Sequence, residues 1–352
     1  MDAFRVWACG CCHIHSDLQY GRRSLGDAIE QSEVGGAEGG PPFDWDIMVN
    51  LGDLSGTQGP PTDADGPPVV AQMNAGRRHR IEQIYCLLGN HDASGPKEEC
   101  QWWFKKWIDP LGLNPQYSQL HAERRPFPIE GTWERYAFRA ENVLFLMIGD
   151  RNDGGPPKGR GEHGGYPAGA ITTETFEWWR AMVEDNQDSI IVTCAHHMLR
   201  DTTTATGRWE GVNGNYHHPY EDAEGSSYLY WVGDDTDSNA FHDYFAAHPH
   251  AIDLWLGSHT HAHPDDRFGR KEMVEEHWGV TFVNVGAMTR YHGRSERKWW
   301  PSSRLLTFER DRRELLLQCY LHTSHYSSQG WYRPVERKIT LRHVFGKDPA
   351  AR

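Results

Sequence analysis

Short apolar runs, each about as long as a buried strand, recur along this chain and alternate with stretches of helical periodicity. The runs cover residues 4–9, 47–51, 84–88, 143–148, 190–195, 252–256 and 281–285. Residues 24 to about 34 are typical of a helix. Phe176, Trp179 and Val183 share one face of another helix. Strands that alternate with helices predict an α/β layered fold with a substantial buried sheet.

The organisation of the chain indicates one domain with long loops. Two apolar runs, 305–308 and 314–321, flank a polar segment and predict a β-hairpin, so we expect mixed sheets. The sequence has no internal repeat and no clean linker, which favours a single domain over residues 1–345 and a short tail over 346–352. Three segments, about 54–75, 153–171 and 201–238, are expected to form long loop insertions.

Composition and charge exclude several classes of protein. Apolar residues make up 38% of the chain and charged residues 24%, which is typical of a globular protein. The net charge of −13 argues against general nucleic-acid binding, because a phosphate backbone requires a basic surface. No apolar stretch has the length of a membrane span or of a signal-peptide core, so we expect a cytoplasmic protein without membrane association. The 7 cysteines form no spaced ligand pairs and are expected to be reduced and mostly buried.

Four of the apolar runs end in residues that can bind metal ions. These endings are Gly52-Asp53, Gly89-Asn90-His91-Asp92, His196-His197 and Gly257-Ser258-His259-Thr260-His261. Because strand ends of an open α/β sheet meet at one edge, we expect these side chains to converge on a crevice. Carboxylate, amide and imidazole ligands suit Mn²⁺, Fe or Zn²⁺. Two such ions side by side can bind a phosphate group, generate hydroxide and stabilise a leaving oxygen.

In this order, the four endings resemble the motifs of the calcineurin-like metallophosphoesterase superfamily, from the first strand to about His261. The resemblance implies a four-layered α/β/β/α sandwich with mixed β-sheets and a dinuclear metal centre at the sheet edge. It also implies a metal-dependent hydrolase of phosphate esters, either a phosphomonoesterase or a phosphodiesterase. In such an enzyme, a hydroxide that bridges two Mn, Fe or Zn ions attacks phosphorus. The expected partner is therefore a small phosphorylated substrate.

By the same resemblance, five residues of these motifs would bind the two ions. Asp53 would be the carboxylate that bridges both ions. Asn90, His196 and His259 would bind the second ion. His261 would bind the first ion.

Two further residues of the Gly-Asn-His-Asp motif would act in catalysis. His91 would lie beside the attacking water and the leaving group as a proton donor or electrostatic stabiliser. Asp92 would orient His91 and fix its tautomer.

Four residues of the segment after the run 143–148 are candidate substrate contacts. Arg151 and Asn152 follow that strand directly, so they could reach a phosphate or cap the strand in a turn. Arg160 and His163 belong to a glycine-rich stretch that could form a substrate lid or a solvated loop.

The chain departs from the family pattern in two places. The family has Gly-His-x-His, whereas here Ser258 separates Gly257 from His259, and we still expect His259 and His261 to be ligands. At the first strand the family has Asp-x-His, whereas this chain has Cys-Cys-His-Ile-His-Ser-Asp-Leu-Gln over residues 11–19.

Three alignments of this first segment are open. Cys11 and His13 preserve the expected strand length, with cysteine in place of aspartate; His13 and His15 form a His-x-His pair. Asp17 and Gln19 match the family's local sequence best. Because a cation site needs anionic ligands and Asp17 is the carboxylate of this segment, we expect Asp17 with His13 or His15 to complete the shell of the first ion.

Two other functions are compatible with the sequence. A non-catalytic binding or scaffold protein could keep the fold with a degraded first metal site, and it would bind fewer than two ions and show no turnover. A metal-dependent hydrolase could instead act on a non-phosphate substrate. His13-Ile14-His15 suggests an amidohydrolase, but such a barrel needs more βα units and leaves the Gly-Asn-His-Asp motif without a role.

Overall fold

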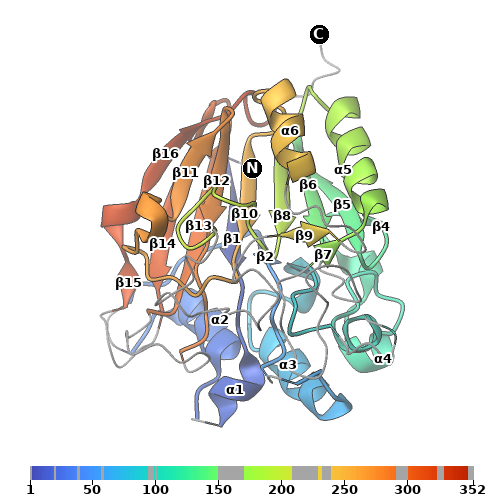
Figure 1. The fold of residues 1–352 in the computed structure, drawn as a ribbon. Coiled ribbons are helices and arrows are strands. Elements are labelled where there is room, and N and C mark those ends of the chain that lie inside the picture. The colour runs from blue at the N-terminus through green and yellow to red at the C-terminus, as the bar shows by residue number, and fades with distance from the viewer. Residues whose placement is uncertain are drawn as a thin grey trace.

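A computed structural model describes residues 2–19, 21–37, 40–56, 59–93, 99, 101–149, 170–207, 229–231, 239–290, 300–322 and 329–347. Its strands form two seven-stranded sheets and one two-stranded sheet. The two large sheets lie face to face with helices outside them (Figure 1), which is the four-layered α/β arrangement expected from the sequence.

The first sheet has the strand order β15-β14-β13-β1-β2-β3, with β16 paired to β14. Its strands are β1 (Ala3–Cys9), β2 (Ile47–Asn50), β3 (Ile84–Cys86), β13 (Ser302–Glu309), β14 (Glu314–Leu321), β15 (Gly330–Trp331) and β16 (Arg337–Thr340). β1, β2 and β3 run parallel, while β13 runs antiparallel to β1. β13 and β14 form the predicted hairpin, so the sheet is mixed.

The second sheet has the strand order β11-β12-β10-β8-β6-β5-β4. Its strands are β4 (Glu130–Gly131), β5 (Arg135–Ala140), β6 (Val143–Ile148), β8 (Ile190–Ala195), β10 (Leu254–Gly257), β11 (Val274–His277) and β12 (Val280–Asn284). The four strands from β6 to β12 in the middle of this order are parallel, and the flanking β5 and β11 are antiparallel. Outside both large sheets, β7 (Ala170–Ile171) pairs with β9 (Tyr230–Trp231).

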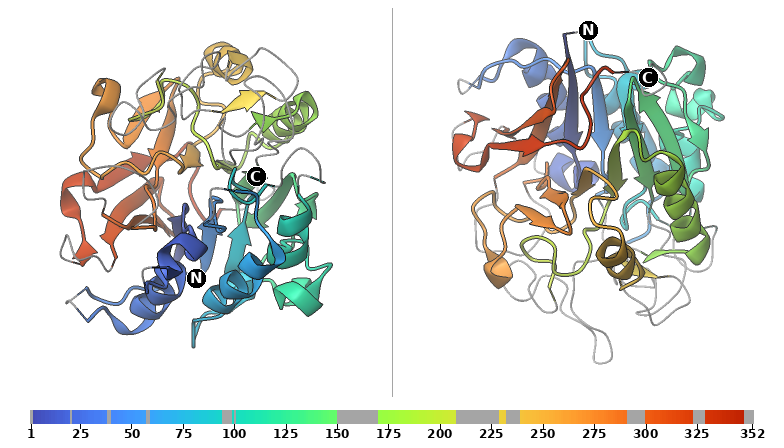
Figure 2. Two further views of the ribbon diagram at one scale, coloured as in Figure 1. Left: turned by 60° about the horizontal axis from the view of Figure 1, so that its bottom comes forward. Right: turned by 90° about the horizontal axis from the view of Figure 1, so that it is seen from above.

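Helices cover the outer face of each large sheet (Figure 2). The α-helices are α1 (Ile14–Leu18), α2 (Ser24–Val34), α3 (Gly66–Met73), α4 (Pro115–Ser118), α5 (Thr173–Asp185) and α6 (Asn239–Ala247). α2 and α3 pack on the first sheet, and α5 and α6 pack on the second. The buried positions of α5 include Phe176, Trp179 and Val183, which confirms the predicted helical face.

Both faces of the central strands are buried, which explains why the sequence shows continuous apolar runs. In β1, Val6 and Ala8 point into the core between the two sheets, whereas Trp7 and Cys9 point toward the helices of the first sheet. Successive side chains of a strand alternate between its faces, so a strand covered on both sides must be apolar at every position. All seven predicted runs form strands in the two sheets.

One of the three expected loop segments needs correction, and the other two lie mostly outside the described residues. The segment 54–75, expected to be a loop, contains α3, whose first turn holds Pro67 and Pro68. Proline has the φ that the first turn of a helix requires, so this pair begins a helix here. Most of the segments 153–171 and 201–238 lies outside the described residues. Among the helices that are described, none combines the length and apolar character needed to cross a bilayer.

Candidate metal centre

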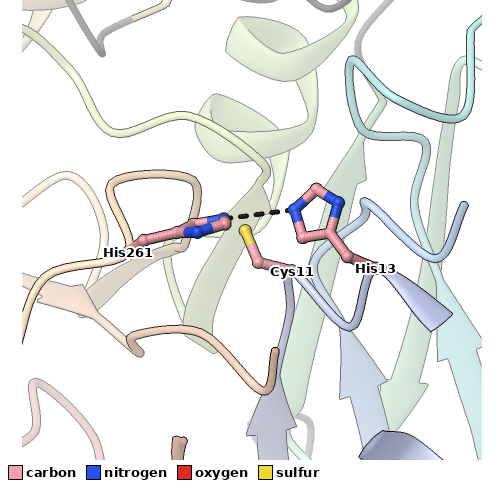
Figure 3. A group of neighbouring side chains, drawn as sticks. All are labelled: Cys11, His13 and His261. Carbon is pink, nitrogen blue, oxygen red and sulfur yellow. Dashed lines mark hydrogen bonds between the residues drawn. The ribbon is translucent and has the colours of Figure 1, made fainter. Parts of the chain in front are cut away.

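The residues predicted at the strand ends converge between the two sheets. Residues after β1, β2 and β3 come from the first sheet, and residues after β8 and β10 come from the second. Potential donor atoms lie within 4.8 Å of one another in four overlapping groups: Cys11, His13 and His261; Cys11, Asp53 and His196; His13, Asp53 and His91; and His196, His197 and His259. Figure 3 shows the first of these groups. Segments far apart in the sequence therefore form one cluster of metal-binding residue types.

Asp53 is at the middle of this cluster. Its Oδ2 lies 3.0 Å from Nε2 of His196 and 3.6 Å from Nε2 of His13. Its Oδ1 accepts a hydrogen bond of 2.7 Å from the backbone N–H of His91. Burial alone would raise the pKa of Asp53, but the imidazoles of His196, His91 and His13 hold it well below its usual range. The imidazoles therefore favour the anionic form of this carboxylate, whose Oδ2 lies near both His196 and His13.

Two pairs of imidazole nitrogens lie near Asp53. Nε2 of His13 is 3.1 Å from Nε2 of His261, and Nε2 of His196 is 3.1 Å from Nδ1 of His259. Nδ1 of His196 lies 2.5 Å from the carbonyl oxygen of Leu51. Because a carbonyl oxygen only accepts, Nδ1 of His196 donates this hydrogen bond, and Nε2 is the ring nitrogen directed toward Asp53 and His259.

Cys11 brings a sulfur atom to the cluster. Its Sγ accepts a hydrogen bond of 3.1 Å from the backbone N–H of His259. The hydroxyl of Ser258 lies 3.1 Å from the same sulfur and 2.7 Å from the carbonyl oxygen of Gly286. Burial raises the pKa of the Cys11 thiol, and the charge of Asp53 raises it further. Cys11 thus lies in the cluster, two residues after the end of β1.

Five residues of the cluster have a left-handed backbone. The φ angles are 49° for Cys11, 41° for His13, 58° for Asp53, 65° for His259 and 47° for His261. Residues other than glycine rarely adopt this conformation, which costs about 1–3 kcal/mol at each position and concentrates at functional sites. These backbone conformations turn the chain after β1, β2 and β10 and direct the five side chains toward the cluster.

Two glycines allow the loops after β2 and β3 to touch. A Cβ atom on Gly89 would lie 2.4 Å from Oδ1 of Asp53, and a Cβ on Gly52 would lie 2.6 Å from the Cα of Gly89. Gly52 also has a φ of +86°. Only glycine fits such an approach of one backbone to another, and this approach sets the position of Asp53.

The structure gives Asp92 different partners from the expected one. Its carboxylate accepts hydrogen bonds from the backbone N–H groups of Asp53 at 2.7 Å, Ser55 at 2.8 Å and Gly89 at 3.0 Å. None of the described contacts joins it to the His91 ring. Burial, together with the nearby charge of Asp53, raises the pKa of Asp92 to about 7. Asp92 is therefore a positioning residue for the loop that carries Asp53.

Asp17, expected with His13 or His15 to complete the shell of the first ion, is not brought to the cluster, and neither is His15. Neither residue is in the four groups that the described residues form. Nδ1 of His15 lies 3.4 Å from Oδ1 of Asp65. The Asp17 carboxylate lies 2.5 Å from Nη1 of Arg22 and accepts a hydrogen bond of 2.6 Å from the hydroxyl of Thr289. Helix α1 begins directly after His13, and it carries both residues away from the strand end.

Of the remaining predicted residues, Asn90 and His91 are among the described residues and the candidate substrate contacts are not. Asn90 and His91 lie in the turn after β3, where Asn90 is fully buried and the His91 ring centroid is 4.7 Å from that of His13. The candidate substrate contacts lie outside the described residues; they are Arg151, Asn152, Arg160 and His163. The sequence places His197 in the strand ending His196-His197 but assigns it no role; in the structure it is buried, with its ring centroid 3.9 Å from that of His259.

Comparisons with solved structures find chains of low sequence identity. Vacuolar protein sorting 29 from Cryptosporidium parvum is 10% identical, with 97% of this chain and 100% of that chain covered and a TM-score of 0.38. The corresponding protein from Chaetomium thermophilum is 10% identical, with 97% of each chain covered and a TM-score of 0.33. The sulfate thiohydrolase SoxB from Thermus thermophilus is 11% identical, with 96% of this chain and 56% of that chain covered and a TM-score of 0.38. At these values the similarities carry no argument about function.

The comparison with curated proteins finds no match. A family model described as calcineurin-like phosphoesterase matches residues 4–263. The matched region begins in β1 and ends just beyond His261, so it contains the whole converging cluster. Because this match covers most of the chain, the chain belongs to the calcineurin-like phosphoesterase family.

Proposed function

We propose that this protein is a hydrolase of phosphate esters that depends on two transition-metal ions. One observation carries the proposal: the Asp53 carboxylate lies between two sets of histidines, with Oδ2 3.0 Å from His196 and 3.6 Å from His13. A buried carboxylate in this position can serve as a ligand shared by two ions.

The donor set fits two such ions. The first position would take His13, His261 and Asp53, and the second would take Asp53, Asn90, His196 and His259. Imidazole, carboxylate and amide donors suit Mn²⁺, Fe and Zn²⁺. When bound, two of these ions supply positive charge for a phosphate group and lower the pKa of water into the neutral range. His15 and Asp17 have other partners, Asp65 and Arg22, so they are not part of this ligand set.

The residues of the chain prepare the site for this chemistry. The imidazoles of His196, His91 and His13 lower the pKa of Asp53, which favours the ionised carboxylate that a cation binds. The hydrogen bond from His196 to Leu51 directs the lone pair of Nε2 inward, as an orienting partner of a metal-binding histidine does. Asp92 ties the loop of Asp53 through three backbone N–H groups.

We assign proton transfer to the leaving oxygen to His91. Its backbone N–H is held by Asp53, so the residue is fixed beside the shared ligand. Its 6% exposure exceeds the 0–2% exposure of the histidines assigned as ligands, which supports a position nearer to solvent than theirs. A histidine in this place can donate a proton to a departing alkoxide near neutral pH.

The test measures metal content per chain by mass spectrometry, on protein purified without chelator, together with hydrolysis of generic phosphomonoester and phosphodiester substrates. About two transition-metal ions per chain and metal-dependent hydrolysis are expected. Asp53→Ala should lose both ions and nearly all activity.

Asp17→Asn is the matched control for Asp53→Ala. It removes a buried carboxylate of the first-strand segment whose described partners are Arg22, Thr289 and Arg290, and it should retain two ions. Loss of an ion in this variant would refute the ligand set. Two bound ions with no hydrolysis of any phosphate ester would instead favour a non-catalytic binding protein.

A further inference from the structure

We infer that Cys11 is a thiolate ligand of the first ion, which makes this position selective for a thiophilic ion, Zn²⁺ or Fe²⁺, over Mn²⁺ or Mg²⁺. The inference rests on the proposed dinuclear centre and adds a sulfur donor to it. The two ion positions would then differ in chemical character.

The first support is the place of the sulfur atom. Sγ of Cys11 lies within 4.8 Å of a ring nitrogen of His13 and of His261. It also lies within 4.8 Å of a carboxylate oxygen of Asp53 and of a ring nitrogen of His196. Figure 3 shows the sulfur directed toward the space between the rings of His13 and His261. Of the cysteines that the structure describes, Cys11 alone is in these groups.

Two neighbouring cysteines, Cys9 and Cys12, have surroundings that differ from those of Cys11 and serve as a comparison. The sulfur atoms of Cys9 and Cys12 lie 3.5 Å and 3.4 Å from Nδ2 of Asn50. Both belong to the apolar core between the first sheet and its helices. Packing therefore accounts for Cys9 and Cys12, as is usual for buried cysteine. Cys11 instead faces imidazoles and a carboxylate.

The second support is the set of polar groups around the sulfur. The backbone N–H of His259 donates to Sγ at 3.1 Å, and the hydroxyl of Ser258 lies at the same distance. A backbone N–H donor of this kind stabilises the negative charge of a metal-bound thiolate and orients the ligand. The single proton of the Ser258 hydroxyl has the carbonyl oxygen of Gly286 at 2.7 Å as its nearer acceptor, so this hydroxyl packs against the sulfur. Ser258 is the residue inserted into the Gly-His-x-His motif, so the added hydroxyl and the added sulfur belong to one arrangement.

The resulting shells predict different preferences at the two positions. The first has one sulfur from Cys11, two imidazoles from His13 and His261, and the shared carboxylate. The second has two imidazoles, an amide and the shared carboxylate. A thiolate selects zinc or iron, whereas hard oxygen ligands suit manganese and magnesium.

Cobalt substitution tests the sulfur ligand without reference to activity. Metal-free protein is loaded with Co²⁺, and we expect a near-ultraviolet thiolate-to-cobalt charge-transfer band. Cys11→Asp, which restores the usual carboxylate of the family, should keep two ions and lose this band. Cys12→Ala removes an adjacent buried thiol and should keep it. After dialysis against equimolar Zn²⁺ and Mn²⁺, the zinc-to-manganese ratio should fall at least roughly tenfold in Cys11→Asp.

X-ray absorption of the zinc-loaded wild-type protein gives a result that needs no folded variant. A zinc–sulfur shell at about 2.3 Å is expected. Two bound ions without this shell, or a charge-transfer band that persists in Cys11→Asp, would overturn the sulfur ligand and leave the dinuclear centre standing. Failure of the wild-type protein to bind Co²⁺ or Zn²⁺ would overturn both proposals.

Discussion

The hydroxyl of Ser258 lies 3.1 Å from the sulfur of Cys11, so the two positions at which this chain departs from the motifs of its family are in contact. The residues follow β10 and β1, which belong to different sheets. This contact predicts that the two residues act as a unit.

Ser258→Ala should weaken zinc binding at the first position. Loss of a group that orients a metal ligand typically lowers affinity by roughly 10-fold or more. Competition with a chromophoric chelator measures the effect. In a Cys11→Asp background the same change should have little effect, because its sulfur partner is gone. Equal losses in both backgrounds would show that the two residues act independently.

His91→Ala should retain two ions and lower the rate of hydrolysis. We assign its ring to proton donation, which contributes roughly 10²–10⁴-fold in enzymes that use it. The loss should be largest for a phosphate ester with a poor leaving group and small for one with a good leaving group. Kinetics on such a pair of substrates, with metal content measured in parallel, check the role. An unchanged rate on the poor leaving group would remove His91 from the mechanism.

Asp92→Asn should reduce metal occupancy at both positions. Its carboxylate accepts three backbone N–H bonds from Asp53, Ser55 and Gly89, and an amide has one oxygen with which to accept them. The loop of Asp53 should loosen, with a loss of metal affinity of roughly 10–100-fold. Full occupancy with a slow rate, as expected for His91→Ala, would point back to a role of Asp92 toward the His91 ring.

Glu33→Gln should destabilise the protein in a pH-dependent way. The Glu33 carboxylate accepts hydrogen bonds from the backbone N–H groups of Arg77 and Arg78 at 2.9 Å and of His79 at 3.0 Å. Burial opposes ionisation, but these bonds outweigh it and lower the pKa of Glu33 from 4.5 to about 2. Hydrogen bonds to a charged group contribute about 1.5–3 kcal/mol to the free energy of unfolding.

The pH dependence of this contribution is set by the lowered pKa. The unfolded chain takes up the proton first as the pH falls, so the contribution is fully present above the ordinary pKa and is lost as the pH falls toward about 2. Urea unfolding at pH 7 and at successively lower pH measures the difference between wild type and Glu33→Gln. Glu30→Gln, on the same helix and more exposed, is the control. A difference that stays constant with pH would contradict the prediction.

The sheets were predictable from sequence because both faces of their central strands are buried. The predicted runs 143–148 and 190–195 coincide with β6 and β8, and each of their residues is buried. α3 was missed because Pro67 and Pro68 are typical of loops unless they begin a helix. A proline pair leads into a loop or into a helix according to the residues after it, and here the apolar face of α3 packs on the first sheet.

The first-strand ligands show where local sequence misleads. Asp17 matches the family's local sequence, but it lies in α1, which begins at Ile14. The carboxylate of Asp17 pairs with Arg22. Strand length favours Cys11 and His13. A ligand must lie close to the end of its strand, and this requirement outweighs local sequence similarity to the family. The partners of Asp92 could not be predicted either. Its partners are backbone N–H groups, which every residue except proline has, so the sequence does not mark them. Their position near the Asp92 carboxylate depends on the contact between Gly52 and Gly89.

Each proposed ion position takes ligands from both large sheets, as with His13 after β1 and His261 after β10, which are 248 residues apart in sequence. Ions held there would act as reversible cross-links that close very long loops of the chain. Unfolding of either sheet would release the ions. Removal of the ions by a chelator would weaken the contact between the two sheets at their strand ends. The integrity of the sandwich and the occupancy of the centre would therefore be a single thermodynamic property of this protein.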